Sequence, residues 1–177
     1  LARDRLTSDP LSAGENLDKA GDVLNQAIQE VRQISHDLRP SLLDDLGLKA
    51  ALVSMLDDFA EMTGIRNNIR LNLPEHRLPD DIEITLYRIV QEAITNVERH
   101  ANASEVVVRI WSQDDQIRVE VKDNGIGFAM ERQPQNEGIG LSNMRERAEM
   151  LGGYFEIRSR PTLGTRLRAM FTLEPVN

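Results

Sequence analysis

A seven-residue repeat of apolar side chains near the start of the chain limits its fold more than any other feature. One apolar residue recurs every seven positions, and another follows each of the first three by three positions. These residues are Leu17, Leu24, Val31 and Leu38, with Ala20, Ala27 and Ile34 between them. Such a pattern over three heptads is typical of an α-helix that buries a narrow stripe against another helix. The sequence therefore predicts a long helix over residues 11–46, interrupted at Pro40, whose ring removes a backbone donor.

This helix needs a partner, because a lone amphipathic helix cannot bury its own stripe in water. An ordinary helical hairpin within one chain would provide a partner, and a dimeric four-helix bundle is the alternative. The chain has only a charged stub, residues 1–8, before the Pro10 that precedes this helix. Because most of a hairpin partner is missing, we favour the bundle and predict a homodimer through residues 11–40.

Downstream of Pro40, the spacing of apolar residues alternates between helical and extended patterns. Helices are predicted over residues 48–62, 81–100 and 140–151, with Asp80 and Glu83 capping the second. Strands are predicted over residues 69–73, 105–112, 116–122, 154–159 and 165–173. Helices that alternate with mostly antiparallel strands pack best on one face of a single sheet. The predicted fold class is α+β: an α/β sandwich with helices on one face of a mixed, mostly antiparallel sheet, preceded by a long dimerisation helix.

Composition excludes several classes of protein. Hydrophobic residues make up 40% of the 177 residues and charged residues 28%, the balance of a globular chain. No apolar run reaches the length of a membrane helix, and the absence of cysteine leaves no disulfide framework. The net charge of −8 argues against nucleic acid as a partner. Because the first residue is Leu1, we expect the chain to be a fragment of something longer, with any membrane attachment in absent upstream segments.

A polar helix face is the first candidate for chemistry. Glu92 and Asn96 are four residues apart, so they share one face of the predicted helix, and Arg99 and His100 extend that region by another turn. An acidic residue, an amide oxygen and two cationic or donor groups could hold Mg²⁺ and a polyphosphate. The alternative for this segment alone is an ordinary solvated helix face.

Two glycine-rich segments follow. Residues 123–128, Asp-Asn-Gly-Ile-Gly-Phe, come directly after a strand, where a carboxylate can accept a hydrogen bond from an amino group such as that of adenine. Residues 137–144 place glycines at the start of a helix, where backbone amides favour a phosphate. Their spacing matches neither the dinucleotide fingerprint nor the P-loop. Taken alone, the first could be a hairpin turn, and so could Gly164-Thr165 in the last hairpin.

Taken in order, these four segments resemble the N, G1, G2 and GT boxes of the histidine-kinase ATPase family. Members of that family share the Bergerat ATP-binding fold, which is also found in DNA gyrase, Hsp90 and MutL. The resemblance covers about residues 80–173. Upstream, residues 34–40 and 43–48 resemble the second dimerisation helix of the subfamily that contains the nitrate/nitrite and membrane-fluidity sensor kinases.

The resemblance implies ATP and Mg²⁺ as cofactors and assigns roles in the N box. Asn96 would bind Mg²⁺, and Arg99 and His100 would lie near the phosphates. Arg99 stands where the family usually has Lys, which keeps the charge but changes the contact geometry. Glu92 matches the hydrolytic base of the gyrase and Hsp90 relatives, and in a kinase it would orient the Mg²⁺ shell.

The other boxes receive roles in the same way. Asp123 would accept the adenine amino group, and Thr165 would lie near the adenine. Four glycines would frame an ATP lid over residues 129–137, and Leu141 would follow the second pair. These glycines are Gly125, Gly127, Gly138 and Gly140.

His36, which precedes Asp37, is not predicted to be the phosphoacceptor. In the subfamily that the chain resembles, the acceptor motif is His-Asp, three residues, then Gln, on the first dimerisation helix. Here Ser41 stands at the Gln position and Pro40 interrupts the helix. We expect the acceptor histidine upstream of Leu1, and none in this chain.

The sequence thus predicts the ATP-binding catalytic region of a two-component sensor histidine kinase. Residues 1–46 would be a partial dimerisation and phosphotransfer region, and residues 47–177 the ATP-binding domain. The chain would be part of the cytoplasmic portion of a membrane-bound sensor. The full protein would phosphorylate its own histidine with MgATP and pass the phosphoryl group to an aspartate on a response-regulator receiver domain. The alternatives are a Bergerat-fold ATPase, a serine kinase that targets an anti-sigma-factor antagonist, and a degenerate dimerisation module that no longer uses ATP.

Overall fold

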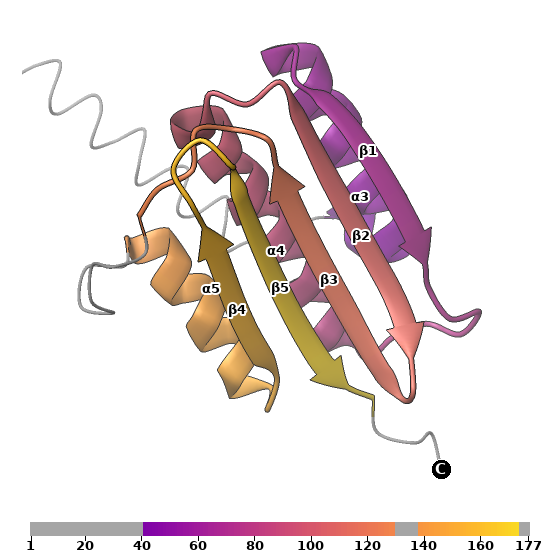
Figure 1. The fold of residues 1–177 in the computed structure, drawn as a ribbon. Helices are drawn as coiled ribbons and strands as arrows, with labels where there is room; N and C mark the ends of the chain where they lie inside the picture. The colour runs from indigo at the N-terminus through magenta and orange to yellow at the C-terminus, as the bar shows by residue number, and fades with distance from the viewer. Residues whose placement is uncertain (1–40, 130–137, 174–177) are drawn as a thin grey trace, which may run out of the picture. The chain divides into compact units, whose positions relative to one another are not determined.

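The computed structural model describes residues 41–129 and 138–173 (Figure 1). The helices are α3 (Ser41–Thr63), α4 (Asp80–Asn96), the π-helix η1 (Val97–Ala101) and α5 (Ile139–Met150). The strands are β1 (Arg66–Asn72), β2 (Glu105–Gln113), β3 (Gln116–Asp123), β4 (Tyr154–Ser159) and β5 (Thr165–Thr172). The predicted heptad stripe, His36 and most of the predicted lid lie outside the described residues. None of the helices in the described part of the chain has the length and hydropathy needed to cross a bilayer.

The five strands form one sheet in the order β1-β2-β3-β5-β4. β1 runs parallel to β2, and the other three neighbouring pairs are antiparallel. Figure 1 shows α3, α4 and α5 together on one face of this sheet. The predicted α+β class, with helices on one face of a mixed, mostly antiparallel sheet, is confirmed.

The core lies between this face and the helices. Alternate residues of β2 point into it, and Val106, Val108 and Ile110 are fully buried, because side chains of a strand alternate between the two faces. Leu43 is also fully buried, although it precedes the predicted domain boundary between residues 46 and 47. The boundary stays a prediction, but the first turn of α3 packs with the core that follows it.

Two local expectations were wrong. Asp80 and Glu83 do not cap α4, whose N-cap is Pro79. The Pro79 carbonyl accepts the backbone N–H groups of Ile82 and Glu83, and the buried Glu83 carboxylate instead pairs with Arg77 at 3.1 Å. The α-helix also ends at Asn96 rather than at residue 100, because the chain widens there into the π-turn of η1.

Candidate functional site

A cavity of about 400 Å³ opens between α4 and η1, α5, and the ends of β3 and β5. This is within the volume range of small-molecule sites. Ten of the eleven predicted site residues line it: Glu92, Asn96, Arg99, His100, Asp123, Gly127, Gly138, Gly140, Leu141 and Thr165. Gly125 is not among the lining residues; it is buried against the backbone of Ala101. The four segments that the sequence separates are therefore brought together around one space, and their individual roles stay predictions.

Asp123 lies at the end of β3 with only 5% of its surface exposed. Its two carboxylate oxygens accept different backbone donors: Oδ1 accepts the Gly125 N–H at 2.7 Å, and Oδ2 accepts the Thr165 N–H at 3.2 Å. These bonds fix the orientation of the carboxylate. A carboxylate has about four lone-pair sites, so acceptor capacity remains for a ligand donor in the cavity.

Two glycines allow the chain to pass close behind Asp123. Gly127 has φ +57° and Gly164 has φ +74°, in the left-handed region that other residues rarely adopt. A Cβ on Gly164 would overlap the backbone carbonyl of Asp123, and one on Gly127 would overlap that of Arg160. Both positions therefore need glycine for conformation and for space.

Ser159 is a polar part of this arrangement that the sequence reasoning missed. Its buried Oγ accepts the Phe128 N–H at 2.9 Å and lies 2.9 Å from the Thr165 Oγ1 and 3.2 Å from the Gly164 carbonyl. The hydroxyl thus ties the chain after Gly127 to the Gly164-Thr165 turn. A signal was present in the sequence, because Ser159 occupies the core-facing phase of a strand whose other core residues are Phe155 and Ile157.

The opposite end of the cavity carries the polar helix face. Asn96 Nδ2 donates to Glu92 Oε1 at 3.3 Å, which leaves the Asn96 amide oxygen as an acceptor. The Glu92 carboxylate lies directly against the Cα of Gly140 at the start of α5, where any Cβ would overlap it. Arg99 and His100 are exposed on η1. π-turns are rare and often occur at functional sites, and this one follows Asn96 directly.

The cavity wall between these two ends is apolar. The residues that form it come from α4, η1, α5 and three strands: Ala93, Val97, Ala101, Val121, Met144, Ile157 and Leu167. No motif in the sequence indicated them individually, because they are ordinary core-phase residues. The cavity therefore combines a carboxylate at one end, an apolar middle, and at the other end an amide, a second carboxylate and two cationic or donor groups.

Two family models match the chain. The model of the histidine kinase-, DNA gyrase B- and HSP90-like ATPase matches residues 81–175. A second model, described as histidine kinase, matches residues 1–43.

Curated relatives and a solved structure agree with these matches. The sensor histidine kinase MctS of Rhizobium johnstonii is 42% identical over 96% of this chain and 37% of its own length. The oxygen sensor histidine kinase NreB of Staphylococcus carnosus is 38% identical over 85% of this chain and 44% of its own. The chain thus spans less than half the length of these relatives. The histidine kinase domain of a blue-light activated kinase from Erythrobacter litoralis has the same fold, with a TM-score of 0.58 at 24% identity over 71% of this chain and 61% of that one.

Proposed function

Because the chain belongs to the histidine kinase-, DNA gyrase B- and HSP90-like ATPase family, we propose that it is the ATP-binding catalytic region of a two-component sensor histidine kinase. In the complete protein, MgATP would phosphorylate a histidine, and the phosphoryl group would pass to an aspartate on a response-regulator receiver domain. Phosphoryl transfer of this kind depends mainly on positioning and charge neutralisation.

The observation that carries this proposal is the polarity of the cavity from one end to the other. Asp123, held by two backbone N–H groups, would accept the 6-amino group of adenine, with Thr165 beside it. The apolar middle fits the flat faces of the base. The phosphates would then point toward Asn96, Arg99 and His100, so the nucleotide has one orientation.

The start of α5 would support the phosphates. Its N-cap is Gly138, and no side chain caps it. Backbone N–H groups in the first turn of a helix favour an anion, and Gly138, which has open space where a Cβ would be, lets one approach closely. We propose that Leu141 then follows the phosphate-contacting turn, and that Gly125 and Gly127 fix the other end of the lid.

Asn96 fits a magnesium ion that arrives with the nucleotide. Mg²⁺ prefers oxygen ligands and keeps several waters. Within residues 41–129 and 138–173, no group of three or more His, Asp or Glu side chains is placed to hold a metal. The Asn96 amide oxygen, which its bond to Glu92 leaves available, would hold the ion together with phosphate oxygens. Glu92 would orient this shell. Bound Mg²⁺ would neutralise charge on the phosphates.

The match of residues 1–43 to a histidine kinase model favours this function over a gyrase-type ATPase or a serine kinase. It also supports the proposals that residues 11–40 form a homodimer and that a receiver domain is a partner. The charged and polar residues around the cavity argue against a degenerate module that no longer uses ATP.

Nucleotide binding tests the proposal directly. MgADP at a hundredfold excess over Kd should raise the free energy of unfolding by about 2.7 kcal/mol. Thermal unfolding is measured with MgADP, with MgGDP as the matched control that lacks the 6-amino group, and with Mg²⁺ alone. Stabilisation by MgADP only is expected. No shift at millimolar MgADP would refute the proposal.

The phosphoacceptor assignment needs its own experiment. We propose that His36 accepts no phosphate, because Ser41 and Pro40 replace the pattern expected after an acceptor. The chain incubated with γ-labelled ATP and Mg²⁺ should stay unlabelled, whereas a longer protein that includes the upstream helix should be labelled. Acid-labile label on this chain, lost in His36→Gln, would contradict the assignment.

A further inference from the structure

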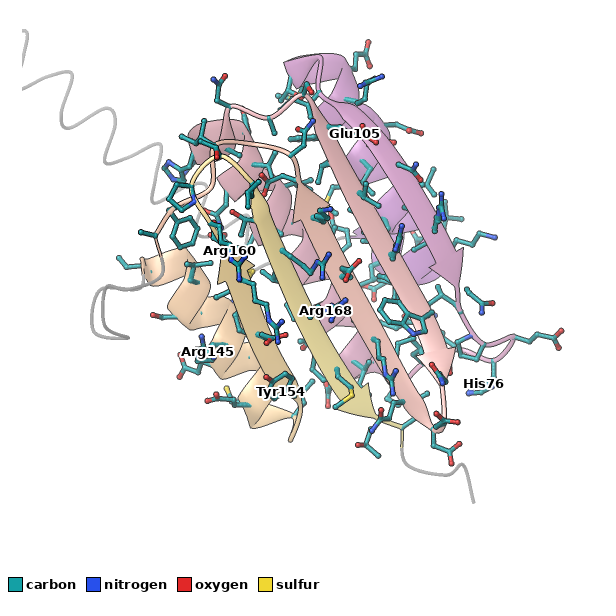
Figure 2. The ribbon with its side chains drawn as sticks, in the orientation of Figure 1. His76, Glu105, Arg145, Tyr154, Arg160 and Arg168 are labelled. Atoms are coloured by element: carbon teal, nitrogen blue, oxygen red, sulfur yellow. The ribbon has the colours of Figure 1, made fainter. Side chains whose placement is uncertain are left out.

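The sheet has a second face that none of the described helices covers (Figure 1). Figure 2 looks onto this face, with Tyr154 and Arg168 labelled on β4 and β5. Residue pairing across the strands places the exposed side chains in rows that run from β4 to β1. One row contains Glu156, Arg168, Glu120, Arg109 and Arg70. The next row contains Arg158, Arg166, Lys122, Val107 and Asn68.

The charge of this face is opposite to that of the whole chain. Eight cationic side chains lie on it: Arg66, Arg70, Arg109, Arg118, Lys122, Arg158, Arg166 and Arg168. Three carboxylates share it: Glu105, Glu120 and Glu156. The face therefore carries a net charge of +5 in a chain whose net charge is −8. A separation of charge on this scale creates a field that favours an anionic surface.

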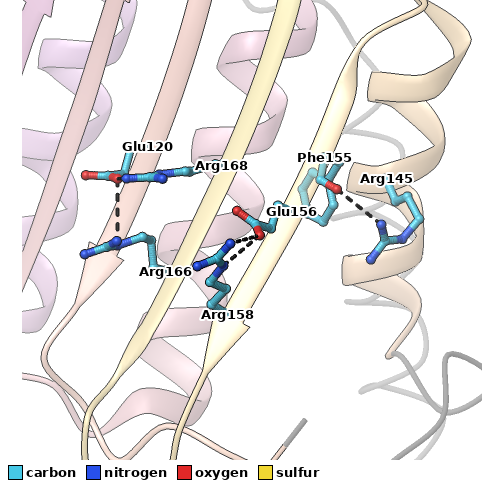
Figure 3. Close-up of polar contacts among 7 residues, drawn as sticks. All are labelled: Glu120, Arg145, Phe155, Glu156, Arg158, Arg166 and Arg168. Atoms are coloured by element: carbon cyan, nitrogen blue, oxygen red, sulfur yellow. Dashed lines mark hydrogen bonds and ion pairs between the residues drawn. The ribbon is translucent and has the colours of Figure 1, made fainter.

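Glu120 in the first row is the centre of a cluster of ion pairs, part of which Figure 3 shows. Glu120 is only 6% exposed, and its Oε2 accepts Arg168 Nη2 and Nε, each at 2.7 Å. Arg109 and Arg166 lie 3.7 Å from its two oxygens. Glu120 and the three arginines around it form a structural ion cluster, and the carboxylate needs no external partner.

The neighbouring row, Arg158, Arg166 and Lys122, is not balanced, and we call it the cationic row. Like charges directly opposite on neighbouring strands are destabilising. Arg158 and Arg166 form ion pairs with Glu156 and Glu120 of the first row. Lys122 is exposed, and no ion pair of Lys122 is found among the described residues. The cationic row itself contains no carboxylate, and the two carboxylates that Arg158 and Arg166 contact belong to the first row, so further negative charge can be accommodated here.

A complementary surface exists on the other side of the same domain. α3 contains five carboxylates and one cation, Lys49. Asp57, Asp58 and Glu61 are all exposed near the C-terminal end of α3, and we call them the acidic stripe. Helix residues three or four apart have Cβ atoms about 5–6 Å apart. Directly opposite residues in an antiparallel pair are about 4.5–5.5 Å apart, so the two sets of charges have matching spacing.

We infer that the cationic row of one copy of this chain docks on the acidic stripe of a second copy. One copy cannot make this contact with itself, because α3 lies behind the sheet and the cationic row lies in front of it (Figure 1). A dimer held through residues 11–40 would raise the effective concentration of the two surfaces. In this contact, the open face of the sheet in one copy would pack against α3 of the other copy.

Cross-linking in the full chain tests this geometry, because the sequence contains no cysteine. One preparation carries Val107→Cys, because Val107 lies directly opposite Lys122 in the same row. The other carries Met62→Cys, because Met62 follows Glu61 of the acidic stripe. Neither change removes a charge. The two variants carry different tags and are mixed with a short bismaleimide, which couples a cysteine of one copy to a cysteine of another. Coupling is expected at low salt and should fall roughly tenfold at about 0.5 M salt, where the screening length is only a few ångströms. Met150→Cys, exposed on α5, replaces Met62→Cys in the control and should couple poorly.

Charge reversal tests the interaction itself. Sedimentation is measured at low salt, where attraction between charged surfaces is least screened, in a Leu24→Asp background that is designed to remove association through the heptad stripe. Lys122→Glu should weaken the remaining association roughly tenfold or more, and adding Glu61→Lys should restore it. Lys49→Glu makes the same charge change away from the cationic row and should not weaken association. Coupling that is absent or insensitive to salt, or association unchanged by Lys122→Glu, would overturn the inference. Lys122-dependent binding to phosphatidylglycerol vesicles without self-association would overturn it in favour of a lipid surface.

Discussion

Replacing Asp123 with Asn should lower both the free energy of unfolding and the affinity for nucleotide. The size of each loss follows from the hydrogen bonds of the carboxylate. In the native chain, one oxygen accepts the Gly125 N–H and the other accepts the Thr165 N–H. An amide has one oxygen and one NH₂ group. Whichever way the Asn is turned, one of the two backbone donors faces another donor. A buried donor left unsatisfied costs about 1–3 kcal/mol of unfolding free energy.

The loss of nucleotide affinity is estimated separately from the loss of stability. A hydrogen bond to a charged group contributes about 1.5–3 kcal/mol, so MgADP should bind roughly ten- to a hundredfold more weakly. Urea unfolding measures the stability of Asp123→Asn without ligand, and calorimetric titration measures binding well below the unfolding temperature. Asp114→Asn is the matched control, because Asp114 is exposed in the β2–β3 turn with φ +52°, a conformation that Asn also tolerates.

Two results would contradict different parts of this prediction. Unchanged urea stability would mean that the two backbone bonds do not hold the carboxylate as described. Reduced stability with unchanged MgADP affinity would mean that adenine does not bind at Asp123, and the orientation proposed for the nucleotide would have to be reversed or abandoned.

Two further predictions concern backbone fit and assembly. Gly164→Ala should lower the free energy of unfolding, measured in urea, by more than Gly152→Ala does. Both glycines have positive φ, and placing another residue in that conformation costs about 1–2 kcal/mol. Only the Cβ at residue 164 would also meet the Asp123 backbone. Equal losses would show that the close approach is unimportant. The chain should also dimerise at micromolar concentration through residues 11–40, and Leu24→Asp or Val31→Asp should abolish this in sedimentation experiments at physiological salt; a monomeric parent would contradict the prediction.

The sequence allowed good predictions wherever the signal is periodic and local. Alternation placed β2, β3 and β4 within a residue or two of their observed bounds, and the glycine segments indicated which parts of the chain would meet. The parallel pairing of β1 with β2 had no comparable local signal, because the direction of a strand is decided by the connection through α4. The Pro79 cap was missed because the acidic residues after it match a capping pattern, yet Glu83 gains more from Arg77 inside the fold.

Other features depend on register rather than on residue type. The cationic row brings Lys122 together with Arg158 and Arg166, which follow it by 36 and 44 positions in the chain, through the pairing of β3 with β5 and of β5 with β4. Ser159 likewise gains its role because β4 ends beside the turn at Gly164. A one-residue shift in either pairing would move every one of these side chains to the opposite face.

The bond between Thr165 and Asp123 spans 42 positions in the chain, and it has a consequence for the order in which the protein acquires activity. β5 is the last of the described strands in the chain, yet it lies between β3 and β4 in the sheet. During synthesis, β3 is therefore made before its neighbour β5, and the end of the cavity proposed for adenine is incomplete until β5 has left the ribosome and inserted. Contacts this distant in sequence form slowly, and domains generally fold as units. Nucleotide can therefore stabilise only a domain that has been completed, and a chain truncated before Thr165 should gain nothing from ATP.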